Sequence, residues 1–425
     1  MSVLKLKRFS VYPQTITLKD GRLIERDLIV LMYGQFIYAW TDFHKYLLFA
    51  KNRSVIPIST KTGSRAFNVT KFLNYVFFEK YHITKLSEIT VEMAERFCNA
   101  YAMCTLAGDS ELTHRNQSTV TTVTNHVVDF LMELTRQNDC MLFKKDDLVK
   151  EVNTLNKKTG RYEKRTIPVF TIFTKSDYDH VINREIPDKA FRIIFQTIRE
   201  RHTDILMLVS LCAFAGLRPS EACNVRRVDS PLGAGIYISP DEYEIVIDLR
   251  HEYNLRSDMT PVGAIKKHRK QKVYFRFLDI FREAYDFYLD YSSGRKYEKE
   301  YGALSNNSKG LAMTYNSFLG KFKTAVHDSI PAMLASDDPL VVYYSRRLQD
   351  GAMISPHVLR HWFTVQLVLD GVTIAELQNW RGDRSPESSL TYLRNKGDLL
   401  KEYRRINNET FDALMRGGER LHEWR

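Results

Sequence analysis

The chain of 425 residues contains only five cysteines, and no two of them have Cys-x-x-Cys spacing. Most of them stand among apolar neighbours, so we expect reduced core residues and no zinc site. The sequence also lacks a Gly-x-Gly-x-x-Gly or Gly-x-x-x-x-Gly-Lys-Ser/Thr phosphate loop, which argues against a reaction driven by a bound nucleotide. We therefore expect a protein that needs no metal and no other cofactor.

Long hydrophobic runs are absent as well. No apolar segment approaches the roughly 18 residues of a membrane span. The N-terminal residues from Met1 to Lys7 lack the apolar core of a signal peptide. We expect a cytoplasmic protein with no membrane partner.

Positive charge, in contrast, is in excess. Lys and Arg number 62 against 51 Asp and Glu, which leaves a net charge of +11. Such a charge suits a polyanionic partner such as nucleic acid. With 44% hydrophobic residues the chain is expected to fold, and its length allows two or three domains, each with its own core.

The N-terminal part divides into three segments by pattern. Residues 1–60 contain alternating apolar segments around Asp20-Gly21, which predicts a β-hairpin in a small appendage of unknown role. Residues 61–140 have helical periodicity and predict a small helical domain, whose pattern suits DNA binding and simple packing equally well. Residues 141–176 contain a basic cluster with Lys157, Lys158 and Arg161. They predict an interdomain linker that is either a solvated surface or a phosphate contact.

A second large region covers residues 177–400. A strongly apolar helix is expected over Ile205–Ala215, ended by Gly216 and followed by a new helix at Pro219. Arg218 is thereby fixed at the corner between the two helices. Taken alone, Arg218 could simply cap the first helix, where a cation is favourable.

Two strands are expected further along, at Glu244–Leu249 and Val273–Phe277. Between them, residues 265–272 form the densest basic run of the chain. This run predicts the tip of a sheet element that contacts a polyanion. Its candidate DNA-binding side chains are Lys266, Arg269 and Lys270.

Another helix is expected to begin at Ser355-Pro356, because Ser is a good N-cap and Pro a good first helical residue. It would carry His357 and Arg360 three residues apart on one face. The start of a helix favours an anion, because unpaired amide groups and the helix dipole point at it.

The same helix is expected to stop at Asp370-Gly371, and a capping box from Thr373 to Glu376 should open the next one. A third helix start follows at Ser385-Pro386, and Tyr392 lies on that helix.

These motifs together resemble those of the tyrosine recombinases, or phage-type integrases, from about Ser64 to Leu400. The segment Gly216–Glu221 is similar to the family's first-arginine motif, and His357–His361 matches its His-x-Leu-Arg-His box. Lys267 is similar to the family's hairpin lysine, and Tyr392 stands where the family has its nucleophile. Each motif alone is weak, since the chain has 23 tyrosines. Their order and spacing together carry the resemblance.

The resemblance implies a role for each of these residues. Arg218 and Arg360 would hold the reacting phosphate as guanidinium forks. Tyr392 would attack the phosphodiester. Lys267 would protonate the leaving 5′-oxygen, and His357 would move a proton or hold the phosphate.

Supporting positions implied by the resemblance are Glu221, His361 and Asp383, although His361 also suits core packing. At Asp383 the sequence departs from the family, which usually has His or Trp nine positions before the nucleophile. An ionised carboxylate cannot donate a hydrogen bond to phosphate.

The implied fold is mainly α with a small β-sheet (α+β), in which a helical core-binding domain and a catalytic domain form a C-shaped clamp around DNA. The implied activity is site-specific recombination at double-stranded DNA sites in the bacterial cytoplasm, at the nucleoid. A tetramer would act on two sites, with an accessory DNA-bending protein as a further candidate partner. The tail, residues 401–425, is expected to pack on a neighbouring subunit.

Two alternatives remain open at this point. A type IB topoisomerase uses the same phosphotyrosine chemistry but acts alone to relax supercoils. A catalytically silent protein of the same fold would only bind DNA.

Overall fold

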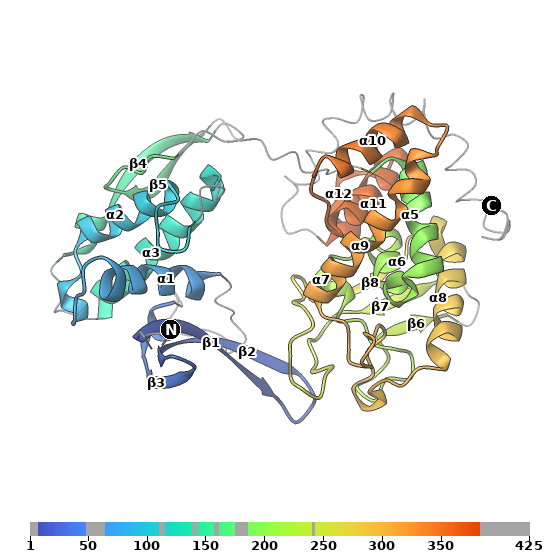
Figure 1. The fold of residues 1–425 in the computed structure, drawn as a ribbon, viewed down its shortest axis with the longest axis horizontal. Coiled ribbons are helices and arrows are strands. Elements are labelled where there is room, and N and C mark those ends of the chain that lie inside the picture. The colour runs from blue at the N-terminus through green and yellow to red at the C-terminus, as the bar shows by residue number, and fades with distance from the viewer. Residues whose placement is uncertain are drawn as a thin grey trace, which may run out of the picture. The chain divides into compact units, whose positions relative to one another are not determined.

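A computed structural model describes residues 7–47, 64–109, 115–137, 141, 143–156, 161–174, 186–239 and 243–382. The chain forms two compact units (Figure 1). The first unit comprises Met1–Ile16 and Ile24–Asp179, and the second comprises Thr17–Leu23 and His180–Arg425. Every helix in the described ranges is too short or too polar to cross a bilayer.

The first unit combines an antiparallel sheet with helices. The expected hairpin around Asp20-Gly21 is confirmed, since the Gly21 amide donates to the Leu18 carbonyl at 2.9 Å and Gly21 has a φ of +78°. The regular elements are β1 (Lys7–Thr17), β2 (Leu23–Tyr33), β3 (Phe36–Trp40), α1 (Arg65–Asn74), α2 (Val91–Ala102), α3 (Gln117–Gln137), α4 (Lys145–Leu148), β4 (Val149–Asn156) and β5 (Arg161–Pro168).

The N-terminal strands share a core with the helices of this unit. Phe9 of β1 and Ile29 of β2 belong to the same buried cluster as Phe72, Phe97 and Phe130 of α1, α2 and α3. Residues expected to form a separate appendage therefore contribute to the core of the helical domain.

The segment expected to be a linker is largely a β-hairpin. Strands β4 and β5 pair antiparallel along their whole length, from Val149 opposite Pro168 to Asn156 opposite Arg161. Leu148 and Val149 are buried in the core of the first unit, so this hairpin packs as part of that unit. Alternating polar and β-branched residues allow such pairing. The high charge of the segment is nevertheless also typical of a solvent-exposed linker, which is why the sequence predicted one.

The second unit is mainly helical and contains a small antiparallel sheet in the order β6-β7-β8. Its elements are α5 (Asp188–Arg201), α6 (Leu206–Phe214), α7 (Pro219–Ala222), β6 (Ile236–Ile238), β7 (Ile245–Asp248), β8 (Lys270–Lys272), α8 (Leu278–Ser293), α9 (Tyr315–Leu334), α10 (Pro339–Gln349), α11 (His357–Leu369) and α12 (Ile374–Arg381).

Helix α6 forms the centre of the second unit, as its apolar sequence predicts, and every one of its residues is buried. Aromatic rings from distant segments pack together here. Phe191 of α5 stacks on Trp362 of α11 with ring centroids 4.3 Å apart, and the Phe214 ring of α6 lies 6.3 Å from the same Trp362. This packing fixes α11, the helix that begins with His357, against α5 and α6.

One expected strand is wrong. The strand is Lys270–Lys272, within the basic run, and Phe275–Phe277 forms a short 3-10 turn that leads into α8. The Tyr274 amide donates to the Phe214 carbonyl at 3.0 Å instead of continuing the sheet. Burial of Tyr274 and Phe277 against the aromatic core outweighs the β-propensity of the sequence Val-Tyr-Phe.

Helix α11 begins and ends nearly as expected. Pro356 is its N-cap, so the helix starts one residue later than the sequence predicts, and Asp370 is its C-cap. The capping box that opens α12 is confirmed, since the Thr373 side chain accepts from the Glu376 amide at 3.3 Å.

A buried carboxyl group joins α5 to α11. Asp188 accepts hydrogen bonds on one oxygen from the Trp362 indole at 2.5 Å and the Gln366 amide at 3.1 Å. Within the described residues, the other Asp188 oxygen and the Gln366 Oε1 have no hydrogen-bond partner. Burial raises the pKa of Asp188 to about 6, although the two donated hydrogen bonds oppose this shift.

We therefore expect Asp188→Asn to change how stability depends on pH. Because its pKa is raised in the folded state, Asp188 stabilises the fold fully below its unfolded pKa, and this contribution is lost as pH rises through about 6. As pH rises from about 5 to about 8, the free energy of unfolding of the wild type should fall by roughly 1 kcal/mol relative to that of the Asn variant. Urea unfolding of both proteins measures this difference, and parallel pH profiles would contradict the assigned pKa.

Candidate active site

The corner between α6 and α7 is built by a glycine and a proline, as the sequence predicts. Gly216 has a φ of +65°, and a Cβ atom there would lie 2.4 Å from the Phe363 ring, so only glycine fits. Pro219 is the first residue of α7 and Arg218 is its N-cap. Arg218 thus opens α7.

Glu221 orients Arg218 from inside the protein. It is fully buried, and its carboxylate accepts from the Arg218 guanidinium at 3.0 Å and from the Arg218 amide at 3.2 Å. The Arg269 guanidinium donates at 3.2 Å to Oε2 of Glu221, the oxygen that also accepts from the Arg218 amide. Burial disfavours the ionised form, but Arg269 and Arg218 more than offset it and hold the pKa of Glu221 below its ordinary value.

Arg360 joins the corner to the end of α12. Its side chain donates to the carbonyl oxygens of Gly216 and Arg381, and it is only 5% exposed. A guanidinium keeps its charge when buried and can serve several acceptors at once. Arg360 therefore holds three segments of the site together.

His357 is the first residue of α11 and reaches solvent. It is nevertheless partly surrounded by protein, and this burial, together with the charges of Arg360, Arg218 and Lys266, lowers its pKa. The three cations come from α11, the α6–α7 corner and the loop before β8. The imidazole is therefore neutral at pH 7, with one nitrogen able to donate and the other able to accept.

The two candidate lysines differ in their surroundings. Lys266 is exposed and contributes to the electrostatics of His357, whereas Lys267 is half-buried and is not among the charges acting on His357. The Lys267 carbonyl accepts from Arg269 at 2.9 Å. Of these two neighbouring lysines, Lys266 is thus the one whose charge contributes to the lowered pKa of His357.

The basic-run residues expected to bind DNA point in different directions. Arg269 has a side chain only 10% exposed and turns inward to Glu221 and to the side-chain oxygen of Gln271. Lys270 is exposed on β8. The structure therefore gives Arg269 a supporting role at Glu221, which the basic sequence alone did not reveal.

Two more of the predicted residues lie within the described ranges. His361 is half-buried on α11. Arg161 begins β5 in the first unit. Lys157, Lys158, Asp383 and Tyr392 lie outside the described residues, as does the tail 401–425.

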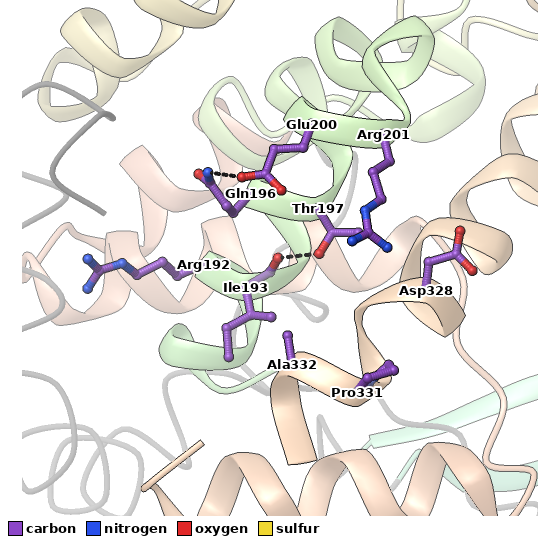
Figure 2. A pocket seen from close by; sticks show the side chains of 9 residues that line it. All are labelled: Arg192, Ile193, Gln196, Thr197, Glu200, Arg201, Asp328, Pro331 and Ala332. Atoms are coloured by element: carbon purple, nitrogen blue, oxygen red, sulfur yellow. Dashed lines mark hydrogen bonds between the residues drawn. The ribbon is translucent and has the colours of Figure 1, made fainter. Parts of the chain in front are cut away.

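A separate hollow of about 490 Å³ lies between α5 and α9 (Figure 2). Helix α5 lines it with Arg192, Gln196 and Glu200, and α9 lines it with Asp328 and Pro331. The Gln196 amide donates to Glu200 at 2.6 Å along one wall. Its lining residues include none of the predicted catalytic residues, so it is distinct from the candidate active site. Within the described residues, His, Cys, Asp and Glu form no cluster suited to a metal ion.

No family model matches the chain, and no curated protein matches it. Solved structures do match over most of its length. The Tn1549 transposon integrase, in complex with transposon right end DNA, has 13% sequence identity and a TM-score of 0.51, covering 86% of this chain and 98% of that chain.

Two further matches have lower TM-scores. The XerH site-specific recombinase bound to difH substrate has 13% identity and a TM-score of 0.46, covering 78% of this chain and 76% of that chain. A lambda integrase dimer bound to a core site has 12% identity and a TM-score of 0.44, covering 82% and 92%. Of these three matches, the Tn1549 integrase has the highest TM-score and is the one used here. Because the sequence identity is only 13%, the match shows similarity of fold alone. The chain therefore has the fold of this transposon integrase, mainly α with small antiparallel sheets, as the sequence motifs predict.

Proposed function

We propose that the chain is a site-specific DNA recombinase that cleaves and rejoins DNA strands through a covalent 3′-phosphotyrosine intermediate. The observation that carries this proposal is the cluster of Arg218, from the α6–α7 corner, with Arg360 and His357, both from α11. Its fold is that of an integrase solved with transposon-end DNA. Chain-wide positive charge supports DNA as the partner.

The arginines suit a phosphate whose charge increases during reaction. Attack on a phosphodiester places additional negative charge on the non-bridging oxygens in the transition state. Guanidinium groups match these oxygens with two parallel hydrogen bonds and remain charged at any working pH. Glu221 supports this role, because it holds Arg218 in place before DNA arrives.

Covalent chemistry is assigned to Tyr392. Its phenol oxygen forms a bond to phosphorus, and the bond from phosphorus to the 5′-oxygen breaks. The phenol proton leaves to a base, for which neutral His357 is the candidate, and the 5′-oxygen takes up a proton from a lysine. The phosphotyrosine ester keeps the energy of the broken bond, so a 5′-hydroxyl can reverse the reaction without ATP.

Recombination also requires protein–DNA and protein–protein contacts. We propose that each of the two units contacts duplex DNA and that a tetramer brings two sites together. Exposed cations such as Lys270 would contact phosphates without reading the sequence.

A plasmid assay tests the function directly. DNA that becomes covalently bound is first selected from random-sequence duplexes nicked beside the random segment. Two copies of the selected sequence are then placed in one supercoiled plasmid. A recombinase should exchange strands between the copies and delete or invert the segment between them. Relaxation without rearrangement would identify a topoisomerase, and binding with neither product would identify a silent DNA-binding protein.

The leaving-group lysine can be identified with a modified substrate. We expect Lys266→Ala to slow cleavage by at least about a hundredfold, as for loss of a general acid. Replacing the 5′-bridging oxygen by sulfur should restore most of the lost cleavage rate, because a thiolate leaves with little protonation. Lys266 is preferred because its charge acts on His357.

Lys267→Ala is the matched control for that experiment. It removes the same charge from the adjacent position, and we expect both substrates to be cleaved within about threefold of the parent rate, a small barrier change. Sulfur rescue of Lys267→Ala, with no effect of Lys266→Ala, would assign the role to Lys267 as the sequence resemblance implies.

A further inference from the structure

The loop that carries the candidate lysines, residues 262–268, is fastened to helix α7. The Ser220 hydroxyl donates to the Ala264 carbonyl at 2.9 Å, and the Asn224 amide donates to the Gly263 carbonyl at 2.9 Å. A Cβ atom at Gly263 would lie 2.5 Å from the Ser220 carbonyl oxygen. The backbone of this lysine loop therefore packs directly on the helix that Arg218 opens.

Further contacts fix the lysine loop on either side of the lysines. The Tyr315 amide donates to the Val262 carbonyl at 2.7 Å, and the Ile265 amide donates to Glu252. Val262 and Ile265 are buried. Beyond the lysines, Arg269 holds the Lys267 carbonyl at 2.9 Å. The main chain that leads into Lys266 is thus fixed, although the lysine side chain itself is long and flexible.

We propose that Ser220 and Asn224 are positioning residues that set the distance between the leaving-group lysine and the phosphate held by Arg218. This inference rests on the proposed function. Both residues belong to α7 or follow it directly, so one short helix positions the arginine and the lysine loop together. A general acid must lie within hydrogen-bond reach of the atom it protonates, and a displacement of about 1 Å can cost roughly a hundredfold in rate.

Asn224→Ala is the main test, because it removes the donor to Gly263. Cleavage of the ordinary substrate should slow by at least about tenfold, since the lysine is no longer held near the leaving oxygen. With the 5′-sulfur substrate the same variant should come within about threefold of the parent rate, because that leaving group does not need the lysine. DNA affinity and thermal unfolding are measured in parallel.

Gly263→Ala is a second variant that keeps Asn224 in place. Its added methyl group cannot fit 2.5 Å from the Ser220 carbonyl oxygen, so the lysine loop must move away from α7. We expect the same recovery with the sulfur substrate. Ser293→Ala is the matched control: its exposed hydroxyl donates to the Asp290 carbonyl of its own helix, and both substrates should be cleaved at the parent rate.

The comparison of substrates separates positioning from general damage to the fold. A defect of equal size on both substrates, or no defect in either Asn224→Ala or Gly263→Ala, would overturn the inference while leaving the proposed function intact. If wild-type protein formed no covalent adduct with either substrate, the proposed function and this inference would both fail.

Discussion

Tyr392→Phe is expected to abolish the covalent protein–DNA adduct while leaving DNA binding nearly unchanged. The substitution removes only the phenol oxygen that would bond to phosphorus, so adduct formation should fall by at least about a thousandfold. Phosphate contacts made by Lys and Arg elsewhere in the chain should preserve affinity. Adduct on nicked duplexes is measured by denaturing electrophoresis, and affinity by titration at fixed salt.

Tyr403→Phe is the matched control for this experiment. It removes the same hydroxyl from a nearby tyrosine and should form adduct at the parent rate. Undiminished adduct in Tyr392→Phe would refute the assignment of the nucleophile, and loss in Tyr403→Phe would move it to that residue.

Loss of either arginine should slow cleavage by at least about a hundredfold, the effect of removing one oxyanion donor worth roughly 3 kcal/mol. Arg218→Ala is the clearer variant, because Arg218 lies at the start of α7 and its partner is the Glu221 side chain. DNA affinity should change much less, since many other cations contact phosphates. Single-turnover cleavage and binding are compared for each variant.

Arg360 needs a different design because it is buried. Truncation would leave the Gly216 and Arg381 carbonyl oxygens without this donor, at a cost of about 1–3 kcal/mol each. Arg360→Lys keeps the positive charge but loses the two parallel N–H donors of the guanidinium. Cleavage should therefore fall even if unfolding experiments show that this variant is as stable as the parent. Arg347→Ala on α10 is the control for loss of one positive charge.

A variant of Arg218 that cleaves normally but binds poorly would mean that this residue only positions DNA.

Local sequence signals predicted the framework of the site well. The glycine and proline around Arg218, the end of α11 at Asp370 and the capping box at Thr373 each depend on a few neighbouring residues. Such signals act through backbone geometry within one or two turns of helix. The burial of α6 also followed from its unbroken apolar sequence.

Features that depend on distant contacts were less predictable. The strand at Lys270–Lys272 is fixed by pairing with β7, and the following residues are drawn into the aromatic core instead of the sheet. Arg269 appeared to be one cation among many until the fold placed Glu221 beside it, 48 residues away in the sequence. The link from Arg360 to Gly216 spans 144 residues. Hydrophobic periodicity contains no information about such pairs.

Charge misled the interpretation in one more place. The basic segment expected to be a linker forms the β4–β5 hairpin, because its residues can pair across strands while their charged side chains stay in solvent. High charge therefore indicates an exposed surface but does not exclude regular structure.

The central claim is that this chain forms a covalent bond to DNA through one tyrosine. The direct measurement is mass spectrometry of peptides from wild-type protein trapped on nicked duplexes in the absence of ATP and divalent metal. We expect a single nucleotide-modified peptide with the modification on Tyr392, linked to a 3′-phosphate. DNA that binds tightly but yields no modified peptide, or a modification on another residue type, would contradict the account.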